Sequence, residues 1–407
     1  MNTVYKKIPR IYLLAVIFYV WHTTIPIIGY YTPAVLYACI IVYLYMFTLT
    51  HVNNPIKIIV SILPILSIHI LSLLYFNSSN IIIQIYQILQ VGLYPLIFMY
   101  ISKTGDVKSY KILFWAVACS YTLTALTTYI GCVTYPGAAR DLAMSEEMIG
   151  SDVYSLYKKA NIGNLSFTYS LLFIIPLLIY MVKSRICRRI ESVSMLIIVS
   201  ISILKTEYTT ALLLMVLCFI LFFLPNKLNI GSLISIVALM LVIFLLAKPF
   251  IGELLLHASS HFESSSSTIS VRLYDLGILL SNDLNAVNGG DIWSRYELYN
   301  QSIQEFFHSP LWGGSNNVGG HSLLFDSLGR FGLIGLVALI LMYKKVFSLF
   351  FSPYSNNPYY GYMLFSFLIV IILAVLNPKD NLGVITFTIP LFALYFKTHY
   401  ESTLDRK

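Results

Sequence analysis

Long, nearly uninterrupted runs of apolar side chains recur along the whole chain and restrict what it can fold into. Most are close to the roughly 17–25 residues that an α-helix needs to cross the hydrocarbon core of a bilayer. Charged residues make up only 11% of the chain, against about 25% in an ordinary soluble domain. Such a chain cannot cover a water-facing surface, which excludes a soluble enzyme, a disordered protein and a nucleic-acid-binding domain.

The runs predict an all-α polytopic membrane protein that forms a single integral domain over residues 1–407. Only helices and closed barrels satisfy every backbone polar group inside lipid, and the length of these runs favours helices. The seventh segment is short and could join the eighth as one interrupted span, so eleven spans are the alternative to twelve. The twelve predicted segments are 11–28, 33–49, 56–76, 81–101, 112–133, 165–182, 193–204, 209–224, 230–247, 323–343, 360–376 and 382–396.

The distribution of positive charge predicts the orientation of these spans. With the N-terminus in the cytoplasm, the cytoplasmic segments would hold 17 of the 26 lysines and arginines, although the outer loops are much longer. This bias follows the positive-inside rule. We therefore expect both termini in the cytoplasm.

Two of the predicted outer loops are long, at residues 134–164 and 248–321, the second between spans nine and ten. Loops of this length in a compact protein are usually functional or disordered. Ser294 and Glu297 form a capping-box pattern, and aromatic residues then recur at helical spacing up to Pro310. This predicts an amphipathic helix over 294–309, which would lie on the membrane's outer face or pack over the helix bundle. The helix could serve stability alone or take part in function.

Next along the chain, a glycine-rich stretch leads to His321, directly before the tenth span. A helix N-terminus offers free N–H groups and a dipole that favour an anion, and a neutral imidazole there can act as a general base. The alternative is a histidine that only forms hydrogen bonds at the interface. The sequence shows no HExxH, Asp-x-Asp, Ser-His-Asp or CxxC pattern, so we expect neither a metal site nor a cofactor.

Three arginines near His321 are further candidates. Arg272 and Arg295 lie in the same outer loop, and arginine binds phosphate bidentately. Arg330 lies nine residues into the following helix, where an ionisable residue is a candidate for function, and Asp326 is its expected partner one turn earlier. Contacts to lipid headgroups or to loop carboxylates are the alternative for each.

Two motifs around His321 resemble those of a known superfamily. His321-Ser322, nine further residues and Gly332-Leu-Ile-Gly335 resemble the H-[NSQ]-x9-G-x-x-[GTY] signature of O-antigen ligases, which O-antigen and capsule polymerases share in looser form. The run from Arg295 to Pro310-Leu-Trp-Gly313 is similar to the segment that precedes the histidine in these proteins. The sharp motifs cover about forty residues, and the rest of the likeness is the layout of spans and loops.

The resemblance implies a GT-C-like membrane glycosyltransferase at the outer face of the bacterial cytoplasmic (inner) membrane. Its donor would be an undecaprenyl-pyrophosphate-linked glycan, and it would use neither a metal ion nor another cofactor. His321 would act on the acceptor hydroxyl, Arg295 would hold the pyrophosphate, and Ser322 would contact substrate.

Weaker likenesses add further substrate-binding candidates. Lys159-Ala-Asn-Ile-Gly-Asn is similar to a degraded form of the superfamily's Arg…Gly-Asn-Pro-Asn stretch, with lysine in place of the arginine. Lys205 stands where a Ser-Arg pair is often found. Arg140 and Arg272 are candidates as cations of the two outer loops, and Arg330 through its place in the helix that follows His321.

The resemblance favours a polymerase that joins lipid-linked repeat units into O-antigen or capsular polysaccharide. A ligase that transfers the polymer to lipid A core is the first alternative. A flippase or other transporter of lipid-linked oligosaccharides is the second, although no repeat of matched broken helices is visible. The expected partners are the lipid-linked glycan as donor and acceptor, the bilayer, a chain-length regulator and a flippase, but no nucleic acid.

Overall fold

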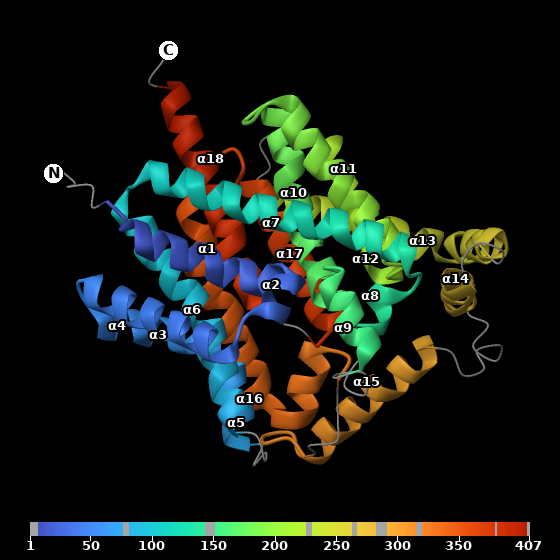
Figure 1. Cartoon of the computed structure of the whole chain (residues 1–407). Helices are drawn as coiled ribbons and strands as arrows, with labels where there is room; N and C mark the ends of the chain where they lie inside the picture. The colour runs from blue at the N-terminus through green and yellow to red at the C-terminus, as the bar shows by residue number, and fades with distance from the viewer. Residues whose placement is uncertain are drawn as a thin grey trace. The chain divides into compact units, whose positions relative to one another are not determined.

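The computed structural model describes residues 7–75, 81–142, 151–224, 230–262, 267–281, 291–314, 320–378 and 381–404. All regular secondary structure in these residues is helical, which confirms the all-α fold class (Figure 1). Where the sequence predicts one domain, the structure groups the chain into two compact units, which are described separately. Unit 1 comprises Met1–Lys227, Val337–Val370 and Asp380–Lys407, and unit 2 comprises Leu228–Leu336 and Ile371–Lys379.

Prolines divide the first part of unit 1 into short helices. Pro26 and Pro55 stand in the first turn of a helix, where their missing N–H costs nothing, and Pro64 lies in a 3₁₀ turn at Leu63–Leu66. The predicted first span is therefore interrupted at Ile25. The helices are α1 (Arg10–Thr24), α2 (Pro26–Tyr31), α3 (Ala34–His51), α4 (Pro55–Ile62), α5 (Ser67–Tyr75), α6 (Ile81–Thr104) and α7 (Val107–Thr134).

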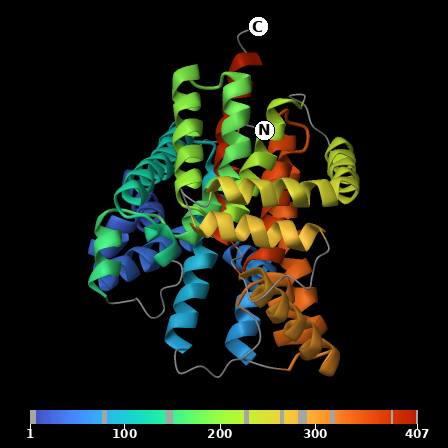
Figure 2. The same cartoon turned by 90° about the vertical axis from the view of Figure 1, so that its right-hand side faces the viewer.

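The next helices build the centre of unit 1. They are α8 (Ala138–Asp141), α9 (Asp152–Lys159), α10 (Leu165–Ser184), α11 (Arg189–Lys205) and α12 (Thr209–Phe219). Of the most apolar stretch of α10, 78% is buried, against 22% for α3, because α10 packs against α11, α12 and α18. Helices α10 and α11 run side by side in both views (Figures 1 and 2). The predicted outer loop 134–164 thus contains α8 and α9.

Unit 2 contains α13 (Ile230–Phe262), α14 (Ser267–Ser281), α15 (Asp291–His308) and the first part of α16 (Leu323–Val346). Helix α13 continues fifteen residues beyond the predicted end of the ninth span, into the region predicted as loop. Helix α15 begins at Asp291, so Ser294 lies inside the helix and is not its N-cap. The predicted flexible link Ser264–Ser267 lies outside the described residues except for Ser267, which begins α14.

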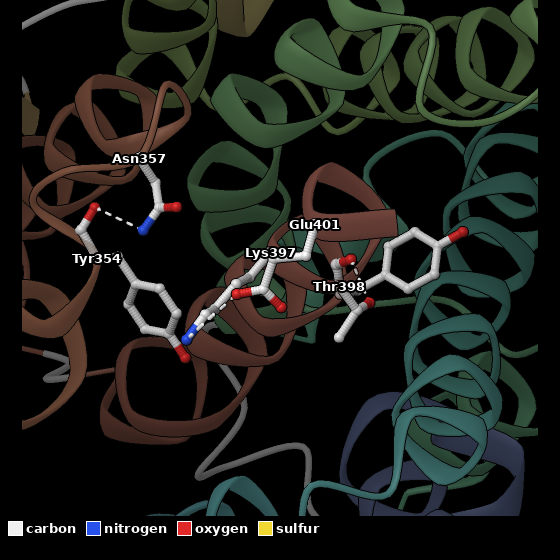
Figure 3. Close-up of polar contacts among 6 residues, drawn as sticks. Tyr354, Asn357, Lys397, Thr398 and Glu401 are labelled. Carbon is white, nitrogen blue, oxygen red and sulfur yellow. Dashed lines mark hydrogen bonds and ion pairs between the residues drawn. The ribbon is translucent and has the colours of Figure 1, made fainter. Parts of the chain in front are cut away.

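The chain ends with a π-helical turn (Phe347–Phe351), a 3₁₀ turn (Ser352–Tyr354), α17 (Tyr360–Leu376), a second π-helical turn (Val384–Thr388) and α18 (Ile389–Leu404). Figure 3 shows local polar contacts of these elements. Asn357 donates a hydrogen bond to the Tyr354 carbonyl (3.2 Å), and Lys397 pairs with Glu401 on α18 (3.8 Å). Both side chains of that ion pair are exposed, so it contributes little to stability, about 0–1 kcal/mol.

Within the described residues, six helical stretches are long and apolar enough to cross a membrane: Ala34–His51, Pro55–Tyr75, Ile81–Thr104, Val107–Thr134, Leu165–Ser184 and Leu323–Tyr354. Large apolar side chains on them are exposed, such as Val35 at 76% and Ile82 at 83%, as expected of surfaces that face lipid. The chain therefore has the architecture of an α-helical membrane protein. The other six predicted segments coincide with helices, and their role as spans stays a prediction.

Candidate functional site

The turn that carries His321 is held from within unit 2. Asp326 is buried, and its Oδ2 accepts hydrogen bonds from the backbone N–H groups of Gly320 (2.8 Å) and Ser322 (3.4 Å). Gly320 has a φ of +110°, a conformation that favours glycine. Both His321 and Arg330 lie near enough to interact electrostatically with the Asp326 carboxylate. Asp326 is thus the expected neighbour of Arg330, and it also fixes the turn around His321.

Ser322 caps α16 and is completely buried. Its Oγ accepts a hydrogen bond from the Phe325 N–H (3.1 Å) and lies 3.3 Å from the Ala374 carbonyl, to which it donates. The Leu323 N–H donates to the Asn377 carbonyl (3.0 Å). The structure therefore places the predicted substrate-binding residue Ser322 between the start of α16 and the end of α17.

These contacts correct one expectation about the start of α16. The sequence predicts free N–H groups there that could hold an anion. In the structure, the N–H groups of Ser322, Leu323 and Phe325 already donate to Asp326, Asn377 and Ser322, respectively. An anion at this site could therefore not use these three N–H groups.

Tyr299 on α15 brings Arg295 close to the His321 turn. Its hydroxyl donates to the His321 carbonyl (3.4 Å), and its ring stacks on Phe325, with centroids 5.0 Å apart. The pKa of Tyr299 is raised, mainly because the hydroxyl is buried and also because the Asp326 carboxylate carries a negative charge nearby. The Arg295 guanidinium, which contacts the same hydroxyl, partly offsets this rise. The hydroxyl therefore stays protonated at neutral pH. The sequence pattern predicts only that Tyr299 lies on the apolar face of a helix. It does not predict the contact of Tyr299 with the His321 turn.

The two sequence motifs meet in the structure, because the Pro310–Gly314 segment packs against a kink in α16. Gly332 has a φ of +62° and interrupts the helix. The Leu333 N–H donates to the Pro310 carbonyl (2.8 Å), and the Gly314 N–H donates to the Gly329 carbonyl (3.1 Å). These bonds tie the end of α15 to α16, on which His321 is anchored.

Glycine is required on both sides of this contact. A Cβ on Gly332 would lie 2.6 Å from the Pro310 carbonyl oxygen, and a Cβ on Gly313 would collide with the Arg330 carbonyl. Gly313 also has a positive φ, +74°. Beyond the kink, Gly335 leaves no room for a side chain against the Ser327 carbonyl. The glycines of both motifs are thus explained by close backbone packing.

The other predicted site residues lie elsewhere. Arg272 is on α14, which packs against α15 in unit 2. Arg140 on α8, Lys159 at the end of α9 and Lys205 at the end of α11 belong to unit 1. Lys159 Nζ lies 5.5 Å from the centroid of the Tyr30 ring. The contacts around the His321 turn therefore involve Arg295, Ser322 and Arg330, and Arg272 lies in the same unit.

The resulting arrangement contains a guanidinium, a protonated phenol and an imidazole on a backbone held by several hydrogen bonds. A fixed cation and a hydrogen-bond donor can stabilise the negative charge of a leaving phosphate. A neighbouring imidazole can accept a proton from a hydroxyl. The chain matches no known family model and has no match among curated proteins.

Proposed function

We propose that this protein is a polymerase of undecaprenyl-pyrophosphate-linked repeat units and forms O-antigen or capsular polysaccharide. The observation that supports this best is the position of Tyr299, whose hydroxyl contacts both Arg295 and the His321 turn. The two residues that the resemblance assigns to catalysis are far apart in sequence and close in unit 2. The docking of Pro310–Gly314 on the Gly332 kink, which joins the two motifs, supports the proposal as well.

In the proposed reaction, an acceptor sugar hydroxyl attacks the anomeric carbon of the donor glycan. A C–O bond forms there while the bond to undecaprenyl pyrophosphate breaks, and His321 takes the proton of the hydroxyl. Arg295 stabilises the charge that develops on the pyrophosphate, so that the leaving group needs no acid. A direct displacement of this kind inverts the anomeric carbon.

The proposal places this chemistry at the outer face of the bacterial cytoplasmic membrane. The chain would cross the membrane about twelve times, in a GT-C-like arrangement with both termini in the cytoplasm. Because the lipid tail of the donor stays in the bilayer, a site at the membrane boundary can meet its headgroup. Arg272 and Arg330 in unit 2, and Arg140, Lys159 and Lys205 in unit 1, remain proposed contacts for the glycan or its pyrophosphate.

The test uses purified protein in lipid with an undecaprenyl-pyrophosphate-linked repeat unit as both donor and acceptor. Wild-type protein should produce a ladder of longer lipid-linked glycans. His321→Ala and Arg295→Ala should lose it, with rates falling by about 100-fold or more for loss of a general base or a charge-stabilising group. His308→Ala changes an exposed histidine at the far end of α15 and is the matched control.

Two other outcomes would reassign the function. If no ladder forms but glycan is transferred when lipid A core is added, the protein is a ligase. If the natural repeat unit gives no bond formation with either acceptor, while the protein moves it across the bilayer of a vesicle, the protein is a transporter.

A further inference from the structure

A cavity of about 390 Å³ lies in unit 1, and none of the residues assigned to catalysis lines it. It is lined by the end of α1, by α2, by α9 and by the start of α10. Its size falls within the roughly 300–1,000 Å³ that is typical of small-molecule pockets. Polar and aromatic side chains alternate on its wall, among them His22, Thr23, Tyr30, Tyr154, Lys158 and Asn164.

The loop between α9 and α10 is fastened to its neighbours, so this wall has a defined shape. Asn161, with a φ of +57°, accepts a hydrogen bond from the Ile27 N–H (3.1 Å) and donates one to Thr127 Oγ1 (2.8 Å). The Gly163 N–H donates to Thr128 Oγ1 (2.8 Å). These bonds reach α2 on one side and α7 on the other. The loop therefore holds Lys158 and Asn164 in place before any ligand arrives.

Lys158 supplies positive charge to the cavity. It is half-buried, and its Nζ lies 5.5 Å from the centroid of the Tyr154 ring. Burial lowers the pKa of its ammonium, and among the described residues no carboxylate forms an ion pair with it. A partly desolvated ammonium without a neighbouring carboxylate gains from an anionic ligand.

Two other lining residues have unused hydrogen-bonding groups. His22 Nδ1 is buried and has no partner within the described part of the chain, and its ring stacks on Tyr37 with centroids 3.5 Å apart. The side-chain Oδ1 of Asn164 accepts from the Phe167 N–H (3.1 Å), while its Nδ2 has no hydrogen-bond partner among the described residues. Asn164 Nδ2 can donate to a hydroxyl group of a ligand, whereas the buried Nδ1 of His22 is not accessible from the cavity.

We propose that this cavity binds a sugar that carries a single anionic group, either a carboxylate or a phosphate. Lys158 would bind the anion, Asn164 would bind a ring hydroxyl, and the rings of Tyr30 and Phe167 would cover the apolar face of the sugar. If the protein polymerises glycans, the ligand is a charged sugar of the lipid-linked repeat. That identification rests on the proposed function, whereas the binding itself does not.

The test measures binding and needs no transferase activity. Full-length protein in phosphatidylcholine nanodiscs is titrated with glucuronate, glucose 1-phosphate and glucose, and followed by saturation-transfer difference NMR. We expect one or both charged sugars to bind, and glucose to bind at least about tenfold more weakly. Lys158→Gln should reduce the affinity for the charged sugar by about tenfold, the size of one charge-assisted hydrogen bond. Lys103→Gln, an exposed lysine at the end of α6, should leave it unchanged.

Several results would overturn the inference. They are equal affinities of wild type and Lys158→Gln, equal binding of glucose, and no binding of either charged sugar. If inorganic phosphate displaces the bound charged sugar and binds as tightly as that sugar does, the cavity is an anion site that does not recognise sugars. Displacement by phosphatidylglycerol in the nanodisc would show a phospholipid site. His321→Ala should retain the binding, which separates this inference from the proposed catalysis.

Discussion

Tyr299 is the residue on which the geometry of the candidate site most depends. Its ring is packed on Phe325, while its hydroxyl contacts both the Arg295 side chain and the His321 carbonyl. Because it reaches these residues without being the expected base or cation, we regard it as a positioning residue. Its two functions, packing and hydrogen bonding, can be separated by substitution.

Tyr299→Phe should keep the stacking on Phe325 and lose both contacts of the hydroxyl. One hydrogen bond is worth about 1 kcal/mol, so we expect the rate of glycan elongation to fall by about five- to tenfold, with the thermal midpoint lowered by only a few degrees. The measurement is the initial rate of ladder formation next to the midpoint of thermal unfolding. A Phe variant as fast as wild type would show that the hydroxyl has no positioning role.

Asp106 is a second residue with a measurable effect, at the N-cap of α7. Burial acts to raise the pKa of its carboxyl, but hydrogen bonds from Ile8, Ser109 and Lys108 outweigh burial and hold the pKa below its usual value. Because the folded-state pKa is the lower one, the charged carboxylate stabilises the fold above the unfolded pKa of about 3.9. This contribution is lost as the pH falls through the folded-state pKa.

Asp106→Ala should therefore be less stable than wild type by about 1 kcal/mol near neutral pH, the usual cost of losing an N-cap. The difference should shrink as the pH falls below about 4, because the wild-type carboxyl is then protonated. Unfolding midpoints in detergent across this pH range test the prediction. A difference that does not change with pH would mean that the charge does not contribute.

At the scale of elements, the kink in α16 decides how the His321 helix meets the end of α15. The backbone of Gly332 adopts φ +62° and ψ −147°, a conformation open almost only to glycine. Gly329 and Leu333, on either side of Gly332, exchange backbone hydrogen bonds with the Pro310–Gly314 segment. A substitution that disrupts the kink should therefore also disrupt the packing of the Pro310–Gly314 segment.

Gly332→Ala should destabilise the protein by about 2–3 kcal/mol, because backbone strain adds to the close contact with the Pro310 carbonyl. Gly137→Ala is the matched control. Its φ is also positive, +84°, but nothing lies within 4 Å of the added Cβ, so only about 1 kcal/mol of strain is expected. Chemical denaturation of the two variants gives the comparison. Equal losses would contradict the docking of the two motifs.

At the scale of the whole molecule, the predicted orientation depends on the excess of lysine and arginine in the segments assigned to the cytoplasm. Two exposed positions report on opposite sides in this prediction. Lys108 stands in the first turn of α7, on the predicted cytoplasmic side, and His308 ends α15, on the predicted outer side.

Lys108→Cys and His308→Cys should therefore react differently with a membrane-impermeant maleimide. In intact spheroplasts, we expect labelling of the variant at 308 alone, and labelling at 108 only after the membrane is permeabilised. Wild-type protein corrects for the five native cysteines. Labelling of both variants from the same side would overturn the orientation.

The sequence by itself was enough for the helical class and for the position of most helices, because chain length and apolar content of a segment are local properties. It also grouped the residues around His321, since they stand in a short piece of chain whose parts contact one another in the structure, and their function stays a prediction. It missed the extension of α13 to Phe262, the role of Tyr299 and the use of the N–H groups at the start of α16. The contacts of Tyr299 and of the Leu323 N–H depend on partners distant in sequence, the His321 and Asn377 carbonyls, and only the tertiary structure brings those partners together.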